Sequence, residues 1–313
     1  MTRAFTFPGQ GSQAVGMGKE LAEAFPAARE VFEEVNEALG QNLSKLMWEG
    51  PGEELTLTEN AQPALMAVSL AAMRVLEKEG GFALADKAAY VAGHSLGEYS
   101  ALAAAGTFTL ADTARLLKTR GQAMQKAVPV GEGAMAAVLG LEFDDAKAVA
   151  EAASEVGVCQ TANDNAPGQI VLSGAKAAVE RAAELAKEKG AKRAMLLDVS
   201  APFHCALMQP AADKMAEALG TVEMRAPSVP LIANVTAGPV DDPEVIRKLL
   251  VEQVTGMVRW RESVAWLAEN GVTSVVEVGS GKVLSGLAKR ISKELTAANV
   301  GAPGDVEAFL ASL

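Results

Sequence analysis

A serine between two glycines, at the junction of a strand-like and a helix-like segment, constrains this chain most. The apolar run 88–92 predicts a buried strand, residues 93–97 read Gly-His-Ser-Leu-Gly, and a small-residue segment typical of a helix continues to Ala105. The glycines on either side of Ser95 allow a sharp turn that lifts the hydroxyl to the carboxyl edge of a sheet. Free N–H groups at the start of the helix can stabilise an oxyanion, and that of Leu96 is the first candidate. The pattern also occurs by chance in ordinary turns, but its context favours a nucleophilic serine.

A serine nucleophile needs a base, and the chain has only two histidines. His94 is adjacent to Ser95, so its side chain should point away from the hydroxyl and have a structural role. His204 follows a predicted strand and loop and begins a helix predicted over 204–219, where functional residues collect at a sheet edge. If Ser95 uses a histidine, His204 is the base. Cys205 is an alternative nucleophile, but it would leave the turn at Ser95 unexplained.

Arg120 interrupts the apolar stripe of a helix predicted over 110–128. Its neighbours three and four positions away are Leu116, Leu117, Ala123 and Met124. Arginine is almost never buried without a partner. The partner is either an internal carboxylate, in a structural ion pair, or a substrate carboxylate held by two hydrogen bonds.

The order of the predicted elements indicates an α/β fold in two domains. Strands at 4–7, 88–92, 231–235 and 274–278 alternate with helices, which is typical of a mostly parallel sheet covered on both faces. Between them, elements at 133–141, 143–156, 158–162, 169–173, 175–189 and 193–199 run in the order β-α-β-β-α-β, that of a ferredoxin-like unit. We therefore expect a large discontinuous domain, 1–129 and 199–313, and an inserted ferredoxin-like small domain, 130–198.

Composition excludes several classes of protein. The 39 acidic and 28 basic residues give a net charge of -11, which argues against nucleic acid as a partner. The longest uncharged stretch, 226–240, contains three prolines, so we expect no membrane span, and without a signal-like N-terminus we expect a cytoplasmic protein. Cys159 and Cys205 are isolated, so neither a disulfide framework nor a metal site is expected.

Three further motifs have weak context. Residues 9–14 match a dinucleotide-binding glycine pattern, but no second strand ending in an acidic residue follows. Residues 279–282 look like a phosphate loop, yet Val276 and Val283 occupy positions that need glycine and Ser or Thr. Asn234-Val235-Thr236 is a glycosylation sequon, which has no meaning in a cytoplasmic chain.

With Ser95, His204 and Arg120 identified, the sequence resembles the malonyl-CoA:acyl carrier protein transacylases of fatty-acid synthesis. The resemblance runs from the first predicted strand to the last. The matching stretches are Phe-Pro-Gly-Gln-Gly-Ser-Gln at 7–13, Gly-His-Ser-Leu-Gly-Glu-Tyr-Ser-Ala-Leu at 93–102, Arg-Gly at 120–121, Phe-His-Cys-Ala-Leu-Met at 203–208, Glu-Val-Gly at 277–279 and Gly-Lys-Val-Leu at 281–284.

The resemblance implies a hydrolase-like α/β core with a ferredoxin-like insertion. It also implies that Ser95 attacks the malonyl thioester with the help of His204, and that Arg120 binds the malonyl carboxylate. Main-chain N–H groups of Gln10 and Leu96 would then form the oxyanion hole.

Two further residues take roles only from the family pattern. The resemblance implies that a main-chain carbonyl orients the histidine, and the matching position is Gln253. Phe203, the residue before the histidine, belongs to the family's region of acyl specificity.

These expectations combine into a ping-pong acyl transfer from coenzyme A to the phosphopantetheine thiol of acyl carrier protein. We expect no cofactor and a monomer. A local basic patch for the acidic carrier protein would include Lys118, Lys126 or Lys289. The alternatives are a serine thioesterase or esterase with the same Ser-His pair, a nucleotide-binding oxidoreductase based on the Gly9 loop, and a non-catalytic docking module.

Overall fold

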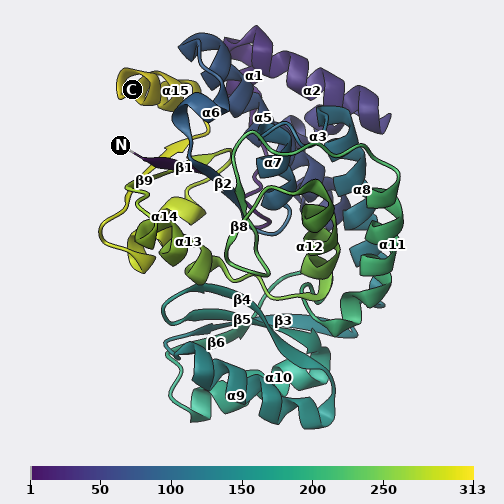
Figure 1. The fold of residues 1–313 in the computed structure, drawn as a ribbon. Helices are drawn as coiled ribbons and strands as arrows, with labels where there is room; N and C mark the ends of the chain where they lie inside the picture. The colour runs from purple at the N-terminus through teal and green to yellow at the C-terminus, as the bar shows by residue number, and fades with distance from the viewer. Residues whose placement is uncertain (1) are drawn as a thin grey trace.

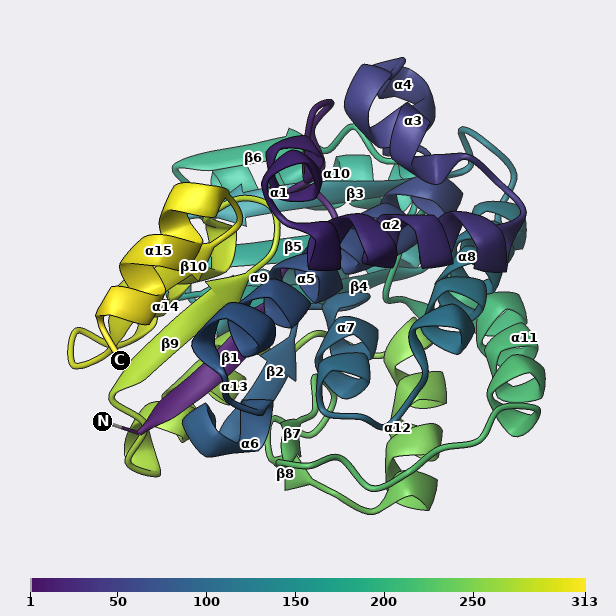
Figure 2. The same cartoon turned by 90° about the horizontal axis from the view of Figure 1, so that it is seen from above.

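Two β-sheets organise the protein in a computed structural model that describes residues 2–313 (Figure 1). The larger sheet has the order β10-β9-β1-β2-β7-β8, and Figure 2 shows β10, β9, β1 and β2 side by side. All of its neighbouring strands are parallel except β7 and β8. The strands are β1 (Arg3–Phe7), β2 (Tyr90–Gly93), β7 (Leu231–Ile232), β8 (Pro239–Val240), β9 (Ser274–Val278) and β10 (Thr296–Val300).

Helices cover both faces of this sheet, as is usual for parallel strands. The helices that precede β3 in sequence are α1 (Lys19–Ala24), α2 (Pro26–Leu39), α3 (Leu43–Glu49), α4 (Gly52–Thr56), α5 (Thr58–Gly80), α6 (Leu84–Lys87), α7 (Gly97–Ala104) and α8 (Leu110–Ala127). Those that follow β6 are the 3₁₀ helix η2 (Ala206–Met208), α11 (Gln209–Gly220), α12 (Pro243–Thr255), α13 (Trp260–Glu269), α14 (Val283–Ile291) and α15 (Pro303–Ala311).

The smaller sheet is antiparallel, with the order β4-β5-β3-β6. Two helices cover the face that points away from the larger sheet, and their side chains form a separate apolar cluster with the strands (Figure 1). The elements are β3 (Gly133–Leu139), α9 (Phe143–Ala153), the 3₁₀ helix η1 (Ser154–Val156), β4 (Cys159–Ala166), β5 (Gln169–Ala175), α10 (Lys176–Glu188) and β6 (Arg193–Leu196).

Strand β4 joins the smaller sheet to the segment between α12 and α13. The Asp164 N–H donates to the Val258 carbonyl at 3.0 Å, and the Val258 N–H donates to Ala162 at 2.9 Å. Beside these bonds, Arg261 of α13 binds the carboxylate of Asp164, with 2.7 Å between Nη2 and Oδ2. Main-chain hydrogen bonds therefore link β4 to the segment that precedes α13.

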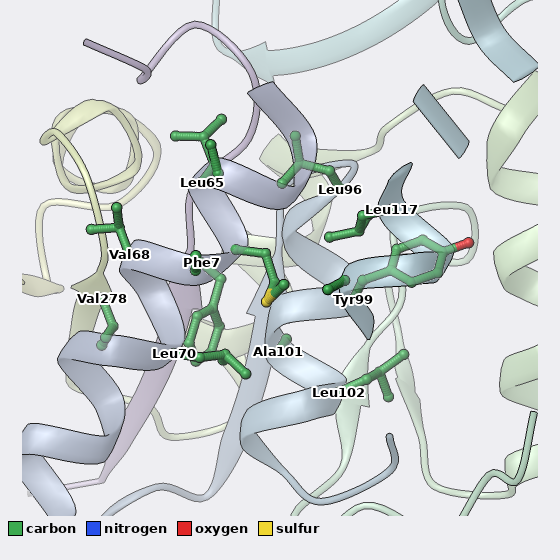
Figure 3. Close-up of a cluster of buried hydrophobic side chains, with 14 of the residues drawn as sticks. Phe7, Leu65, Val68, Leu70, Leu96, Tyr99, Ala101, Leu102, Leu117 and Val278 are labelled. Atoms are coloured by element: carbon green, nitrogen blue, oxygen red, sulfur yellow. The ribbon is translucent and has the colours of Figure 1, made fainter. Parts of the chain in front are cut away.

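The main apolar core lies around α5. Figure 3 shows side chains from α5, α7, α8, β1 and β9 meeting there, among them Phe7, Leu65, Val68, Leu70, Leu96, Tyr99, Leu117 and Val278. Helix α8 crosses α5 closely at Gly121, where an added Cβ would lie 2.5 Å from Glu59 Cα. The approach brings the preceding residue on α8, Arg120, to the first turns of α5, where Gln62 lies.

The structure confirms most predicted elements and corrects three. The helix expected over 204–219 begins at Gln209, which places Pro210 in the first turn, where its missing N–H breaks no hydrogen bond within the helix. His204 lies in the preceding loop with φ 58°. The strand expected over 231–235 has two residues, and that expected over 193–199 ends at Leu196. Within residues 2–313, no helix combines the length and the apolar character that a membrane crossing needs.

Candidate active site

Ser95 occupies the tight turn between β2 and α7, with φ 54°. The flanking glycines are required by space: an added Cβ on Gly93 would lie 1.9 Å from the main chain of Gly97, and one on Gly97 would lie 2.2 Å from the Phe7 carbonyl. A positive φ is unfavourable for serine. The Ser95 N–H donates to Oδ1 of Asn234 at 2.8 Å, which holds the turn in this conformation.

His204 faces the serine hydroxyl, with 2.8 Å between Oγ and Nε2. Its Nδ1 lies 2.9 Å from the Gln253 carbonyl and 3.1 Å from that of Gly256. Both carbonyls are acceptors only, so Nδ1 carries the proton and Nε2 is free to accept one from Ser95. Burial, with a contribution from the charge of Arg120, lowers the pKa of His204 to about 3. The imidazole is therefore neutral at physiological pH, as a general base must be.

Arg120 lies beside this pair and is 1% exposed. Its Nη1 donates to Oε1 of Gln62 at 2.8 Å, and its Nη2 donates to Oε1 of Gln253 at 2.8 Å and to Ser95 Oγ at 3.1 Å. The guanidinium carbon lies 5.7 Å from the ring centroid of Tyr99. Burial lowers the pKa of Arg120.

No carboxylate in residues 2–313 forms an ion pair with Arg120. The structural ion pair left open by the sequence is therefore absent. The partners of the guanidinium are neutral oxygens, and within the described part of the chain one hydrogen on Nη1 and the Nε–H have no partner. A cation held in this way can accept the carboxylate of a bound molecule.

A cavity of about 400 Å³ opens onto these groups. Its lining includes Ser95, His204 and Arg120, and also Gln10, Leu96 and Phe203. Strands β3, β4 and β5 supply the opposite wall with apolar and amide side chains, namely Met135, Ala137, Asn163, Asn165, Gln169 and Val171. Both sheets thus contribute to one site.

Gln10 and Leu96 reach the cavity from two loops. Neither main-chain N–H has an acceptor among the described residues, so both are free to donate. The Gln10 side chain faces the other way, where its Oε1 accepts from Thr58 Oγ1 at 2.9 Å. The glycine before it serves packing, because a Cβ on Gly9 would lie 2.6 Å from the His94 carbonyl.

A polar network that was not predicted from the sequence lies behind the serine. Glu98 and Asn234 are at most 1% exposed, and they bind each other and Gln253. Burial raises the pKa of Glu98 to about 8. The signal that was available is a glutamate in the otherwise apolar segment after Ser95; Asn234 was considered only as part of a sequon.

His94 turns away from the serine. Its Nε2 lies 2.8 Å from Oδ1 of Asn165 on β4, and its ring lies 5.6 Å from that of Trp260. The side chain therefore links the serine turn to the smaller sheet, in agreement with the structural role predicted for it.

Comparison with known proteins connects this geometry to one family. A model described as acyl transferase domain matches residues 4–302. The malonyl CoA-acyl carrier protein transacylase of Bacillus subtilis is 48% identical over 99% of this chain and 96% of its own length. The chain belongs to the malonyl CoA-acyl carrier protein transacylase family. A crystal structure of acyl-carrier-protein-S-malonyltransferase from Bartonella henselae is 61% identical, with a TM-score of 0.98 and coverage of 100% of this chain and 99% of that one.

Another transacylase structure shows a member of this family with a bound protein. It contains a type II PKS acyl-carrier protein in complex with its malonyl-transacylase, is 43% identical to this chain, has a TM-score of 0.96 and covers 100% of both chains. A basic patch that includes Lys118, Lys126 or Lys289 stays a prediction for this chain. Lys118 binds Gln41, Asn60 and Glu59. Helix α8, which carries Lys118 and Lys126, and helix α14, which carries Lys289, lie on opposite sides of the molecule in both views (Figures 1 and 2).

Two remaining sequence features concern metal ligands and the glycine at 279. No group of three or more His, Cys, Asp or Glu side chains in the described part of the chain is arranged to hold an ion. The glycine at 279, in the sequence that resembles a phosphate loop, has φ 135°, and a Cβ there would lie 2.4 Å from Ser69 Oγ. Backbone geometry and packing therefore explain why glycine occupies position 279.

Proposed function

We propose that this protein transfers the malonyl group from malonyl-CoA to the phosphopantetheine thiol of acyl carrier protein through an ester on Ser95. One observation carries the proposal: Ser95 Oγ lies 2.8 Å from a neutral imidazole nitrogen and 3.1 Å from a buried guanidinium without a carboxylate partner. The first contact suits a nucleophile, and the second suits an acyl group that ends in a carboxylate. The names of the relatives agree with this pairing.

In the first half-reaction, His204 Nε2 takes the Ser95 proton as Oγ attacks the thioester carbonyl. The N–H groups of Gln10 and Leu96 stabilise the negative oxygen of the tetrahedral intermediate. The carbonyl re-forms, the bond to sulfur breaks, and the coenzyme A thiolate leaves with the proton from His204. The carbonyl of Gln253 holds the Nδ1–H throughout.

In the second half-reaction, the thiol of acyl carrier protein takes the place of coenzyme A. His204 removes its proton, the thiolate attacks the Ser95 ester, and Oγ leaves with that proton, which restores the enzyme. Arg120 holds the malonyl carboxylate, which fixes the acyl group for both attacks. Phe203 forms part of the wall against which the acyl group lies.

The proposal extends to the organisation of the chain. We assign residues 1–129 and 199–313 to a hydrolase-like catalytic domain and residues 130–198 to a ferredoxin-like small domain. Support comes from the β4-β5-β3-β6 order of the smaller sheet and its separate apolar cluster. We further propose a cytoplasmic monomer that needs no cofactor.

The test is the mass of the intact protein after brief exposure to malonyl-CoA or acetyl-CoA, followed by a pantetheine thiol. We expect a malonyl adduct that requires Ser95, forms in preference to acetyl only while Arg120 is present, and leaves on the thiol. Ser95→Ala and Arg120→Ala are the matched variants. An adduct lost equally fast to water would indicate a thioesterase or esterase, and no adduct would refute acyl transfer.

A further inference from the structure

Glu98 is a buried carboxyl group that the reaction above does not use. It lies in the first turn of α7, is 1% exposed, and does not line the cavity. Its Oε1 accepts the Asn234 N–H at 2.8 Å, and Nε2 of Gln253 is the only donor to its Oε2 among the residues that the structure describes. No Lys, Arg or His in residues 2–313 forms an ion pair with it.

The Gln253 side chain between Glu98 and Arg120 has one orientation that satisfies its neighbours. An amide presents donors on one side and an acceptor on the other. The NH₂ group faces three acceptors: the Ser95 carbonyl at 2.9 Å, the Asn234 side-chain oxygen at 3.3 Å, and Glu98. Its Oε1 consequently faces Arg120 Nη2 at 2.8 Å.

Reversal of this amide would remove a bond from the guanidinium. The NH₂ group of Gln253 would then face Arg120, whose guanidinium has no acceptor. The amide oxygen of Gln253 would face three other oxygens. Of those three acceptors, Asn234 Oδ1 already accepts the Ser95 N–H. Glu98 Oε2 has no other donor, so it contributes most to the choice between the two orientations.

We propose that Glu98 is a positioning residue for the acyl-binding arginine: by accepting from Gln253, it keeps that amide's oxygen on Arg120 and so directs the guanidinium to a carboxylate-bearing acyl group. The inference rests on the proposed function, because it concerns the same arginine. Glu98 acts through Gln253 and touches neither substrate. Malonyl transfer therefore depends on Glu98, and transfer of an acyl group without a carboxylate does not.

A simple charge effect predicts a different result. If Glu98 acted only through its charge, the change to a neutral side chain would increase the attraction between the guanidinium and a carboxylate, or leave it unaltered where burial already keeps the carboxyl protonated. The isosteric change Glu98→Gln separates the two effects. The NH₂ group that this substitution introduces would face the NH₂ group of Gln253 and favour reversal of the Gln253 amide.

The experiment measures the first-turnover acylation of Ser95 by malonyl-CoA and by acetyl-CoA, from the mass of the intact protein, in wild type and Glu98→Gln. We expect the malonyl rate constant to fall about ten- to a hundredfold, as for the loss of an aligned hydrogen bond to a charged group, while the acetyl rate constant stays within about twofold. In an Arg120→Ala chain, the same change at 98 should leave the malonyl-to-acetyl ratio unaltered.

The matched control is Glu277→Gln. Glu277 is also fully buried and accepts two main-chain N–H groups, of Leu284 and Ser285, at 3.1 and 2.7 Å, outside the site. We expect it to alter stability but not the malonyl-to-acetyl ratio. If Glu98→Gln does not fold, Glu98→Asp supplies the same comparison, because it moves the acceptor away from Gln253 by one methylene. Glu98→Asp should also lower the malonyl-to-acetyl ratio.

The inference is refuted if both acyl rates fall together, if the malonyl rate is unchanged, or if it rises. Each of these results requires a wild-type enzyme that forms the malonyl ester. Absence of that ester on wild type would instead refute the proposed function, so the two failures are distinguishable.

Discussion

Because the His204 imidazole is buried, the free energy of unfolding should depend on pH by an amount that can be calculated. The pKa is lowered from 6.5 to about 3 in the folded protein. As the pH falls below 6.5, the unfolded chain binds this proton before the folded one, so the imidazole destabilises the fold progressively until the pH reaches the folded-state pKa. Linkage gives a loss of about 2 kcal/mol between pH 7 and pH 5.

The perturbation is His204→Asn, which removes the titrating group. The assay is urea unfolding of wild type and variant at pH 7, 6 and 5 and constant ionic strength. We expect the free energy of unfolding of wild type, relative to the variant, to fall by about 2 kcal/mol from pH 7 to pH 5. Glu98, whose raised pKa has the opposite effect over this range, is present in both proteins and cancels in the difference.

Ser95→Ala is the control, because it retains the imidazole and removes only the hydroxyl. Its difference from wild type should stay constant with pH to within about 0.5 kcal/mol. A constant difference for His204→Asn would mean that the imidazole titrates as an exposed one does. Burial would then not keep the base neutral, and the reasoning would be wrong.

Three further predictions concern the scaffold and the polar contacts. Gly93→Ala should destabilise the protein by about 3 kcal/mol or more in urea unfolding, because the added methyl meets the main chain at the start of α7; Gly220→Ala, whose methyl meets nothing within 4 Å, should be neutral or slightly stabilising. Arg261→Ala should cost about 3 kcal/mol in the same assay, because it leaves the buried Asp164 carboxylate unpaired, and a second change, Asp164→Asn, should recover part of the loss. Thr58→Val removes a hydroxyl that is hydrogen-bonded to the side chains of Gln10 and Gln62. The substitution should slow malonyl acylation of Ser95 about tenfold with little change in melting temperature. Equal slowing in Thr58→Ser, which keeps the hydroxyl, would contradict this account.

The sequence was most informative where the chemistry is local. The immediate neighbours of Ser95 are enough to propose it as the nucleophile, and helical spacing alone predicts that Arg120 is buried. Only two histidines compete for the role of base, so His204 follows by elimination, although the helix expected to begin there starts five residues later. Pro210 was the missed signal, because proline is favoured in the first turn of a helix.

The polar network behind the serine could not be predicted in this way. Asn234 is 139 residues from Ser95 and lies just after a strand of two residues, too short to show alternation. Gln253 looks in sequence like any residue near a helix end, and its contacts depend on how α12 packs. Hydrogen bonds between distant single residues leave no periodic pattern, so they are found only once the fold is known.

The position of β1 has a consequence for the order in which the chain can fold. This first strand lies between β2 and β9, with Phe5 opposite Val91 on one side and Val276 on the other. During synthesis, β1 can pair with β2 early, but its second edge has no neighbour until residues 274–278 have left the ribosome. Exposed strand edges promote aggregation, and contacts between distant residues form slowly. We therefore expect the nascent chain to depend on chaperones for most of its synthesis, and a chain truncated before β9 to aggregate although it contains Ser95, His204 and Arg120.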